Sequence, residues 1–203
     1  MKALRVGLTG GLACGKSTVA RMFQSCGAYT VEADEIVHAI LNEELWIKII
    51  SECFGKQIIE HNKINRYKLA ELVFDHPDEL IKLNGILHPE VKSRLDQSWS
   101  LFAKEHNEGV YIDVVPLLIE VGWQKDYHKI IVVRSTLEQQ MERTKILHGW
   151  TSRHTLARIA QQMPLSEKIR YADFVIDNEG DLETLEDKIK DIWKKLIQDK
   201  GEK

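Results

Sequence analysis

The sequence has few of the features that mark secreted, membrane or nucleic-acid-binding proteins. Its 203 residues include only three cysteines, Cys14, Cys26 and Cys53, without a C-x-x-C pair or zinc-ligand spacing, which excludes a disulfide framework and a structural zinc site. No apolar run approaches the ~20 residues that span a bilayer, and the one after the first residues is too short for a signal peptide. With 28 basic and 31 acidic residues, the net charge of −3 supplies no basic field for nucleic acid or a membrane surface. These absences favour a cytoplasmic protein with free thiols.

A phosphate-binding motif near the start dominates what is present. Residues 10–18 read Gly-Gly-Leu-Ala-Cys-Gly-Lys-Ser-Thr and match G-x-x-x-x-G-K-[ST], the P-loop. An apolar run at 4–9 predicts a strand before the motif, and helically spaced apolar residues at 16–26 predict a helix after it. The rival motif G-x-G-x-x-G is absent, so a dinucleotide-binding fold has no support. Motif, strand and helix together favour a phosphate site over a glycine-rich turn that binds nothing.

The residue types of the motif suit phosphate chemistry. Glycines let successive N–H groups point inward as an anion nest, and the helix N-terminus adds partial positive charge. Lys16 is expected to reach the outer phosphates, and the Ser17 hydroxyl to ligate Mg²⁺. Oxidation of Cys14, inside the loop, would be expected to obstruct the site. The nucleotide-binding residues predicted here are Gly10, Gly11, Ala13, Cys14, Gly15, Lys16, Ser17 and Thr18.

Strands and helices alternate along the chain, which predicts an α/β fold. Besides 4–9, runs rich in Val and Ile at 28–32, 110–115, 129–134 and 173–177 are typical of strands buried on both faces of a parallel sheet. Thr136 to Gln139 predicts a capping box at the start of a helix. An apolar stripe after Asp181 predicts a final helix packed on the sheet. We therefore expect a three-layer P-loop kinase fold around a five-stranded parallel sheet.

Two segments are additional to the strands and helices that a minimal sheet needs, and they divide the single expected domain into three parts. The core takes 1–34, 107–144 and 171–203, with a helical insertion at 35–106 and a lid at 145–170. Ligands of such folds bind beyond the carboxyl ends of the strands. The insertion is therefore placed to hold a phosphate acceptor and the lid to close over ATP, as a small-molecule kinase requires to exclude water.

Asp34 is the candidate to orient or deprotonate the acceptor hydroxyl. It follows the second strand and should face the same cleft as the P-loop, together with Glu32 if the strand continues. A general base is not obligatory, because phosphoryl transfer depends mostly on positioning and charge stabilisation. On position alone, capping of a helix from Glu35 onward explains Asp34 equally well.

Further motifs make the chain resemble the dephospho-CoA kinase family. Beside the P-loop they are E-A-D at 32–34, L-H-P-E-V at 87–91, V-P-L-L-I-E at 115–120, R-I-A-Q-Q-M-P at 158–164 and A-D-F-V-I-D-N-E-G at 172–180. The resemblance runs from about Arg5 to Trp193 in the family's order and spacing. It implies transfer of the ATP γ-phosphate to the ribose 3′-hydroxyl of dephospho-CoA, giving coenzyme A and ADP in the last step of coenzyme A biosynthesis, with Mg²⁺ as cofactor.

The resemblance also implies roles for single residues. Lys16 and the loop amides would hold the phosphates, Asp34 would act on the acceptor hydroxyl, and Arg143 at the start of the lid would neutralise transferring charge. Four more residues would lie near the adenine or the acceptor cleft: Asn178 and Gly180 for the first, His88 and Glu120 for the second. From the residues alone, an alternative interpretation is that His88-Pro89 breaks a long helix and that Glu120 is a surface acid on a short helix.

Three positions depart from the family pattern. Glu32 replaces an aspartate, which puts its part in the magnesium shell in doubt. Ala13 stands where the family often has glycine, and Leu147 replaces a second lid arginine, so that charge stabilisation would rest on Arg143 alone or with help from Arg153 or Arg158.

Two other functions compete with this interpretation. One is another small-molecule P-loop kinase, acting on a nucleoside or sugar. The other is a nucleotide-binding switch, which would need D-x-x-G after the third strand and N-K-x-D, whereas 113–116 reads D-V-V-P and 62–65 reads N-K-I-N. The sequence leaves the oligomeric state open.

Overall fold

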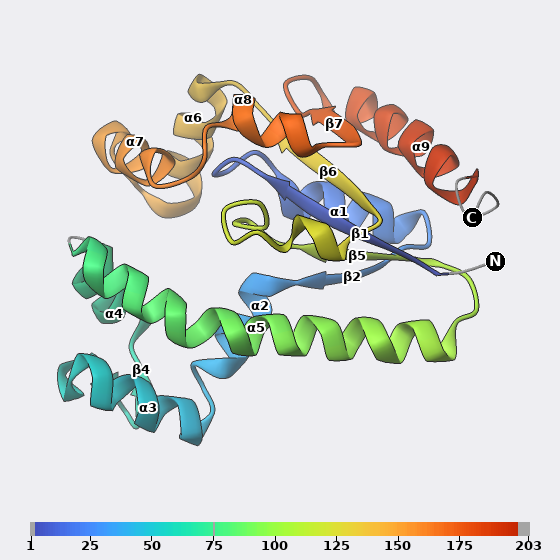
Figure 1. Cartoon of the computed structure of the whole chain (residues 1–203). Helices are drawn as coiled ribbons and strands as arrows, with labels where there is room; N and C mark the ends of the chain where they lie inside the picture. The colour runs from blue at the N-terminus through green and yellow to red at the C-terminus, as the bar shows by residue number, and fades with distance from the viewer. Residues whose placement is uncertain (1–2, 75, 199–203) are drawn as a thin grey trace. The chain divides into compact units, whose positions relative to one another are not determined.

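The computed structural model describes residues 3–74 and 76–198 and separates them into two compact units (Figure 1). The first unit contains the residues up to Glu32 and those from Trp99 onward, and the second is Ala33–Ser98.

Within the described residues, the first unit is built on a five-stranded sheet in the order β2-β5-β1-β6-β7. β1 is central and pairs with β5 from Leu4 and Val110 onward, and with β6 from Val6 and Lys129 onward. Every pairing is parallel, so the predicted parallel sheet and its five strands are confirmed. The strands are β1 (Leu4–Gly10), β2 (Tyr29–Glu32), β5 (Val110–Val114), β6 (Lys129–Arg134) and β7 (Phe174–Asp177).

Helices of the first unit begin and end close to the predicted positions. Thr136 and Gln139 form the predicted capping box, each accepting from the backbone N–H of the other. The helix that they begin runs to His148, so the predicted lid starts inside it. The helices are α1 (Lys16–Ser25), α6 (Leu137–His148), α7 (Ser152–Ala160), α8 (Leu165–Lys168) and α9 (Leu182–Gln198), with the 3-10 helices η2 (Trp123–Asp126) and η3 (Ile169–Tyr171) and the end of α5 (Pro77–Glu105).

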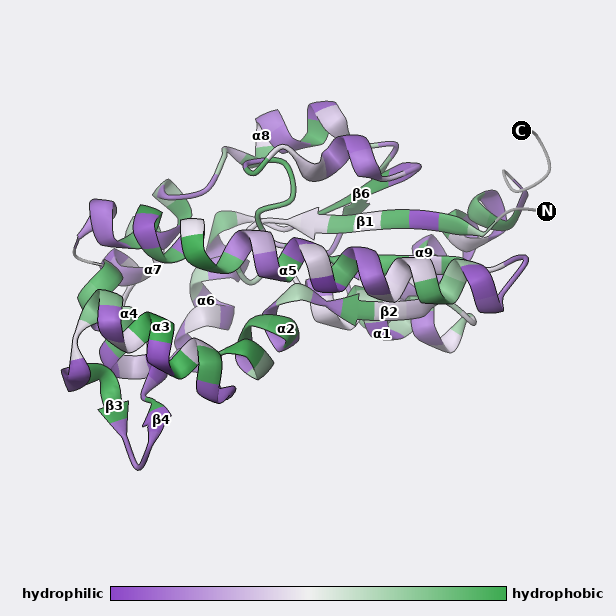
Figure 2. Cartoon of the chain, turned by 60° about the horizontal axis from the view of Figure 1, so that its bottom comes forward, coloured by the Kyte–Doolittle hydropathy of each residue, from purple (hydrophilic) through white to green (hydrophobic). Residues whose placement is uncertain are grey.

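The two faces of the sheet bury different sets of side chains, because successive residues of a strand point to opposite faces. Leu8 and Ile112 belong to the buried cluster that α1 and α9 cover. On the other face, the Tyr111 ring packs against Trp99 from the end of α5, with ring centroids 5.5 Å apart. Helices on both faces give the three expected layers, and Figure 2 shows hydrophobic residues along β6 and in separate segments of β1.

The second unit is mostly helical, as expected, but it also contains a hairpin. His61 and Asn62 both have positive φ, of 50° and 61°, and form the two-residue turn of the hairpin. That turn is hydrophilic in Figure 2. The elements are α2 (Ala33–Ile40), α3 (Glu44–Phe54), the 3-10 helix η1 (Lys56–Ile58), β3 (Ile59–Glu60), β4 (Lys63–Ile64), α4 (Arg66–Phe74) and the first part of α5.

Helix α5 continues through Pro89, so the proposal that His88-Pro89 breaks a helix is wrong. Proline removes the bond to the carbonyl four residues earlier and crowds it. That residue is Gly85, where an added Cβ would have no contact within 4 Å outside the local helix backbone. Across 3–74 and 76–198, every helix is too short or too polar to traverse a lipid bilayer.

Candidate functional site

The P-loop connects β1 to α1 through backbone conformations that favour glycine. Gly15 has φ of 90° and stands at the N-cap of α1, and Ala13 has φ of 52°. The first N–H groups of a helix have no intrahelical partner, and no side chain caps α1 among the described residues. The loop therefore presents helix-terminal N–H groups, which together with the helix dipole form an anion site.

Two side chains of the motif contact nearby oxygen atoms. Lys16 Nζ donates to the Gly11 carbonyl at 2.8 Å, which holds the ammonium over the loop. Ser17 Oγ donates to Glu32 Oε2 at 2.9 Å, so the end of β2 meets the first turn of α1. The sequence left the contribution of Glu32 in doubt, and the structure brings its carboxylate to the predicted magnesium-binding hydroxyl.

Arg143 and Asn178 hold the backbone of the loop from the other side. Asn178 Nδ2 donates to the Cys14 carbonyl at 2.9 Å. Arg143 donates through Nη1 to the Ala13 carbonyl at 3.3 Å and through Nη2 to the Asn178 carbonyl at 3.0 Å. The neighbourhood is tight, because a Cβ at Gly15 would lie 2.2 Å from Asn178 Nδ2. Both predicted residues therefore lie at the loop, and both bind its carbonyl groups.

Cys14 is a core residue. Its side chain is fully buried in the cluster under α1, where Sγ accepts from Ser135 Oγ at 3.4 Å. Burial shields the thiol from solvent oxidants, so its expected oxidation lacks the exposure that reactive cysteines need. The other predicted adenine residue, Gly180, lies in the loop that leads to α9, beside Thr184.

Glu120 lies in the turns after β5, where its carboxylate forms an ion pair with Lys168. Glu120 Oε1 is 2.8 Å from Lys168 Nζ and accepts from the Met163 backbone N–H at 3.0 Å. Its side chain is 18% exposed, so the proposal of a surface acid on a short helix is wrong. Lys168 is fully buried.

The lid segment has its own stacked cluster. The Arg158 guanidinium lies 3.9 Å from the centre of the Trp150 ring, and Nε donates to His154 Nε2 at 3.2 Å. Burial lowers the pKa of Arg158. Leu147, which replaces the second lid arginine, is mostly exposed, as is Arg153.

Two predicted acceptor residues belong to the second unit. Asp34 is exposed and lies in the first turn of α2, which begins at Ala33. Because the helix starts before it, the alternative in which Asp34 caps a helix from Glu35 is wrong. His88 is half-buried on α5, and burial lowers its pKa.

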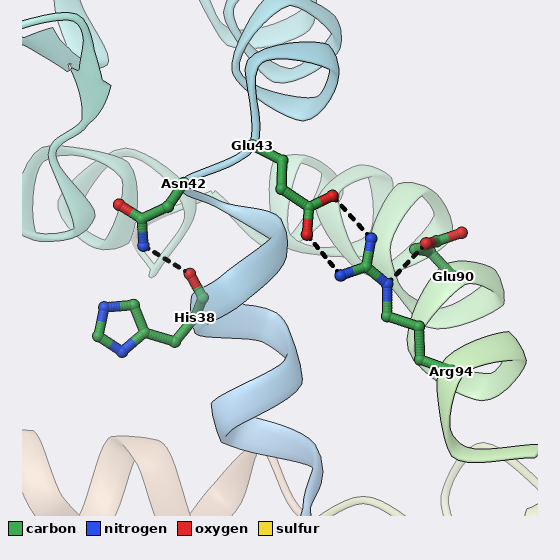
Figure 3. A network of polar contacts seen from close by, with 5 residues as sticks. All are labelled: His38, Asn42, Glu43, Glu90 and Arg94. Atoms are coloured by element: carbon green, nitrogen blue, oxygen red, sulfur yellow. Dashed lines mark hydrogen bonds and ion pairs between the residues drawn. The ribbon is translucent and has the colours of Figure 1, made fainter. Parts of the chain in front are cut away.

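An arginine clamp that the sequence did not reveal holds the second unit together (Figure 3). Arg94 on α5 donates to both oxygens of Glu43, at 2.6 and 2.7 Å, and to Glu90 Oε1 at 2.7 Å. These bonds lower the pKa of Glu43 and raise that of Arg94. Asn42, next to Glu43, donates to the His38 carbonyl at 2.7 Å, so the corner between α2 and α3 is fixed on α5. In the sequence, the one feature that could have indicated this clamp is the i, i+4 spacing of Glu90 and Arg94, which is typical of an ion pair on a helix.

The pair of Ser17 and Glu32 has the ligands that Mg²⁺ prefers, a hydroxyl and a carboxylate. No cluster of three or more His, Cys, Asp or Glu side chains forms a metal cage among the described residues. A magnesium ion bound through few protein ligands and substrate phosphates needs no such cage.

The chain is similar to known proteins over nearly its whole length. A family model described as dephospho-CoA kinase matches residues 4–184. The chain is 36% identical over 198 residues to the dephospho-CoA kinase of Aquifex aeolicus, covering 96% of this chain and 98% of the relative. It is 38% identical over 193 residues to that of Carboxydothermus hydrogenoformans, covering 94% and 93%. The solved dephospho-CoA kinase from Campylobacter jejuni superposes with a TM-score of 0.70 at 26% identity, covering 95% of this chain and 96% of that one.

Proposed function

The chain belongs to the dephospho-CoA kinase family, and from that membership we propose that it transfers the γ-phosphate of ATP to the ribose 3′-hydroxyl of dephospho-CoA. It is an ATP-dependent kinase, and the products are coenzyme A and ADP. The observation that carries the proposal is the P-loop, where Lys16, Ser17 and Glu32 converge beside the N-terminus of α1.

In the nucleotide-binding part of the site, the positively charged and N–H groups are held in place before ATP binds. The N–H groups at the start of α1 bind phosphate oxygens, and Lys16 exchanges the Gly11 carbonyl for the outer phosphates. Arg143 neutralises the charge of the transferring group from its position at the Ala13 carbonyl. Asn178 and Gly180 lie toward the adenine.

Ser17 and Glu32 would hold a magnesium ion. When bound, such an ion neutralises charge on the β- and γ-phosphates. Replacing aspartate with glutamate at position 32 keeps the carboxylate and lengthens its arm, which suits the observed contact with Ser17.

Asp34 acts on the acceptor. It follows Glu32 by two residues at the start of α2 and is exposed, so an acceptor hydroxyl can approach its carboxylate from solvent. His88 contributes to acceptor binding as a neutral imidazole, since burial lowers its pKa. Glu120 borders the acceptor cleft, where Lys168 and the Met163 N–H hold its carboxylate in place.

Residues 145–170 close over the nucleotide as a lid that excludes water, with Arg153 and Arg158 adding positive charge. The three cysteines of the described chain are free thiols, which suit a reducing compartment, and the cytoplasm is the compartment proposed for the reaction.

The test is a coupled ADP-release assay with four acceptors: dephospho-CoA, adenosine, AMP and pantetheine. We expect turnover with dephospho-CoA alone and none from a Lys16→Ala control. Turnover with adenosine or AMP in place of dephospho-CoA would instead establish another small-molecule kinase, and GTP binding without acceptor turnover would establish a switch.

A further inference from the structure

The buried ammonium of Lys168 joins three separate segments of the first unit. Lys168 Nζ lies 2.9 Å from the Pro116 carbonyl, 2.8 Å from Glu120 Oε1 and 3.5 Å from the Gly10 carbonyl. The side chain has no exposed surface. It therefore contacts the first residue of the P-loop and the turn after β5, yet it cannot reach solvent or a ligand in the loop.

The partners of Lys168 are themselves held in place. The Pro116 carbonyl also accepts from Thr9 Oγ1 at 3.0 Å, and Thr9 directly precedes the loop. Glu120 also accepts the Met163 N–H, which ties down the chain just before α8. A buried ammonium is tolerated when a carboxylate and further acceptors surround it, as they do here. The network thus links the entry of the P-loop to the C-terminal end of the lid segment.

The contact with Gly10 bears on the orientation of the loop. A peptide bond is planar and trans, so its carbonyl and N–H point to opposite sides. Because the Gly10 carbonyl faces the Lys168 ammonium, the Gly11 N–H of the same peptide faces away from it. The position is also tight, since a Cβ at Gly10 would lie 2.2 Å from the Val133 carbonyl oxygen. Lys168 therefore favours one orientation of the first peptide of the anion nest.

We propose that Lys168 is a positioning residue of this kinase, which fixes the Gly10–Gly11 peptide and couples it to the end of the lid without touching substrate. The proposal rests on the proposed function, because the anion in the loop is taken to be the phosphate of ATP. Preorganised N–H groups lower the barrier of phosphoryl transfer, so losing this order reduces kcat.

The experiment separates positioning from mere compensation of the Glu120 charge. Lys168→Met alone leaves a buried carboxylate without its cation, which destabilises the fold for an unrelated reason. We therefore compare Glu120→Gln with the double variant Lys168→Met/Glu120→Gln, measuring the melting temperature, kcat, and KM for ATP and for dephospho-CoA. Lys188→Met is the matched control, since Lys188 Nζ likewise donates to a backbone carbonyl, that of Asp177, at 2.9 Å.

A positioning role predicts that the double variant melts close to Glu120→Gln but has a kcat at least tenfold lower. Its KM for dephospho-CoA should stay within threefold, and Lys188→Met should keep the wild-type kcat. Hydrogen exchange of the peptide that contains residues 10–15 should also be faster in the double variant. Equal kcat in Glu120→Gln and the double variant would overturn the proposal, because the ion pair would then serve only the fold.

The variant Lys168→Arg is a second test of the positioning role, and it does not depend on the double variant. It keeps the positive charge opposite Glu120 but replaces the compact ammonium with a larger, planar guanidinium in a site that is fully buried, which displaces the groups packed around it. A positioning role predicts a lowered kcat with retained folding, and a wild-type kcat in this variant would refute it. Wild-type enzyme that is inactive on dephospho-CoA but still binds ATP would overturn the proposed acceptor instead, and exchange of residues 10–15 would still test Lys168.

Discussion

The hydroxyl of Ser17 donates a hydrogen bond of 2.9 Å to the carboxylate of Glu32, which joins the first turn of α1 to the last residue of β2. Ser17 follows β1 and Glu32 ends β2, so the contact lies beyond the carboxyl ends of two strands of the parallel sheet, which is the ligand side of α/β proteins. The contact assembles a hydroxyl and a carboxylate beside the phosphate loop. The predictions below follow from this pair and from the residues around it.

Lys16→Ala is expected to leave the fold intact and to reduce kcat by at least ~10²-fold, because it removes a charge-assisted bond that strengthens in the transition state. Circular dichroism and melting temperature check the fold, and single-turnover kinetics check the chemistry. A variant with wild-type kcat would show that Lys16 has no role at the phosphates.

Asp34→Asn is expected to lower kcat by ~10²–10⁴-fold with little change in ATP affinity, because the amide can no longer accept the proton of the acceptor hydroxyl. The comparison is Glu32→Gln, which should be milder in kcat but should raise the magnesium concentration needed for half-maximal activity. A larger kcat loss in Glu32→Gln would mean that the two acids have been assigned in the wrong order.

Arg143→Ala is expected to lower kcat steeply, and Arg143→Lys to recover only part of it. The guanidinium donates to two carbonyls through separate nitrogens, and a lysine cannot reproduce that fork. The kcat of both variants measures the effect on turnover, and hydrogen exchange of the N–H groups of the P-loop measures the effect on the order of the loop. A normal rate in Arg143→Ala would contradict the charge-stabilising role.

Ala13→Gly is expected to leave stability within ~0.5 kcal/mol of wild type, although glycine loses more entropy on folding. Ala13 has φ of 52°, so relief of left-handed strain offsets the entropy loss. Ala39→Gly in the exposed face of α2 is the control and should cost ~0.5–1 kcal/mol. Equal losses in urea melts of the two variants would show that Ala13 is unstrained, and Ala13→Val should lose more than either.

The pH dependence of stability should carry a contribution from His88. Burial lowers the folded pKa of His88 below its ordinary 6.5, so near pH 6 the unfolded chain binds more protons than the folded one. The contribution of His88 to the free energy of unfolding is therefore fully present above about pH 7, and it is lost as the pH drops through 6.5 toward the folded pKa. Melting temperatures from pH 5 to 8 should fall less steeply on the acid side in His88→Gln than in wild type. Parallel curves would contradict the prediction.

Local sequence patterns were enough to predict the sheet and the P-loop. The strands are apolar runs rich in β-branched residues. The P-loop is a contiguous motif, and its backbone geometry determines which residue types it needs at each position. The capping box of Thr136 and Gln139 is likewise local. By contrast, the β3–β4 hairpin has strands of two residues, too short to show an alternating pattern.

The remaining features depend on distant partners. Lys168 is polar and would ordinarily be exposed, and only Glu120 and two carbonyls far along the chain explain its burial. Arg143 was predicted as a charge at the lid, but no sequence pattern indicates that it binds the Ala13 carbonyl. Helix propensity alone does not predict that α5 continues through Pro89, because proline is the least favourable residue in a helix interior.

The partners of the P-loop have a consequence for synthesis on the ribosome. The carbonyls of Ala13 and Cys14 are held by residues 130 and 164 positions later in the chain. Since the chain emerges from its N-terminus, the motif is exposed for most of translation before the groups that hold it exist. Nascent chains therefore carry the sequence of an ATP site without its structure, and ATP can stabilise only a nearly completed polypeptide.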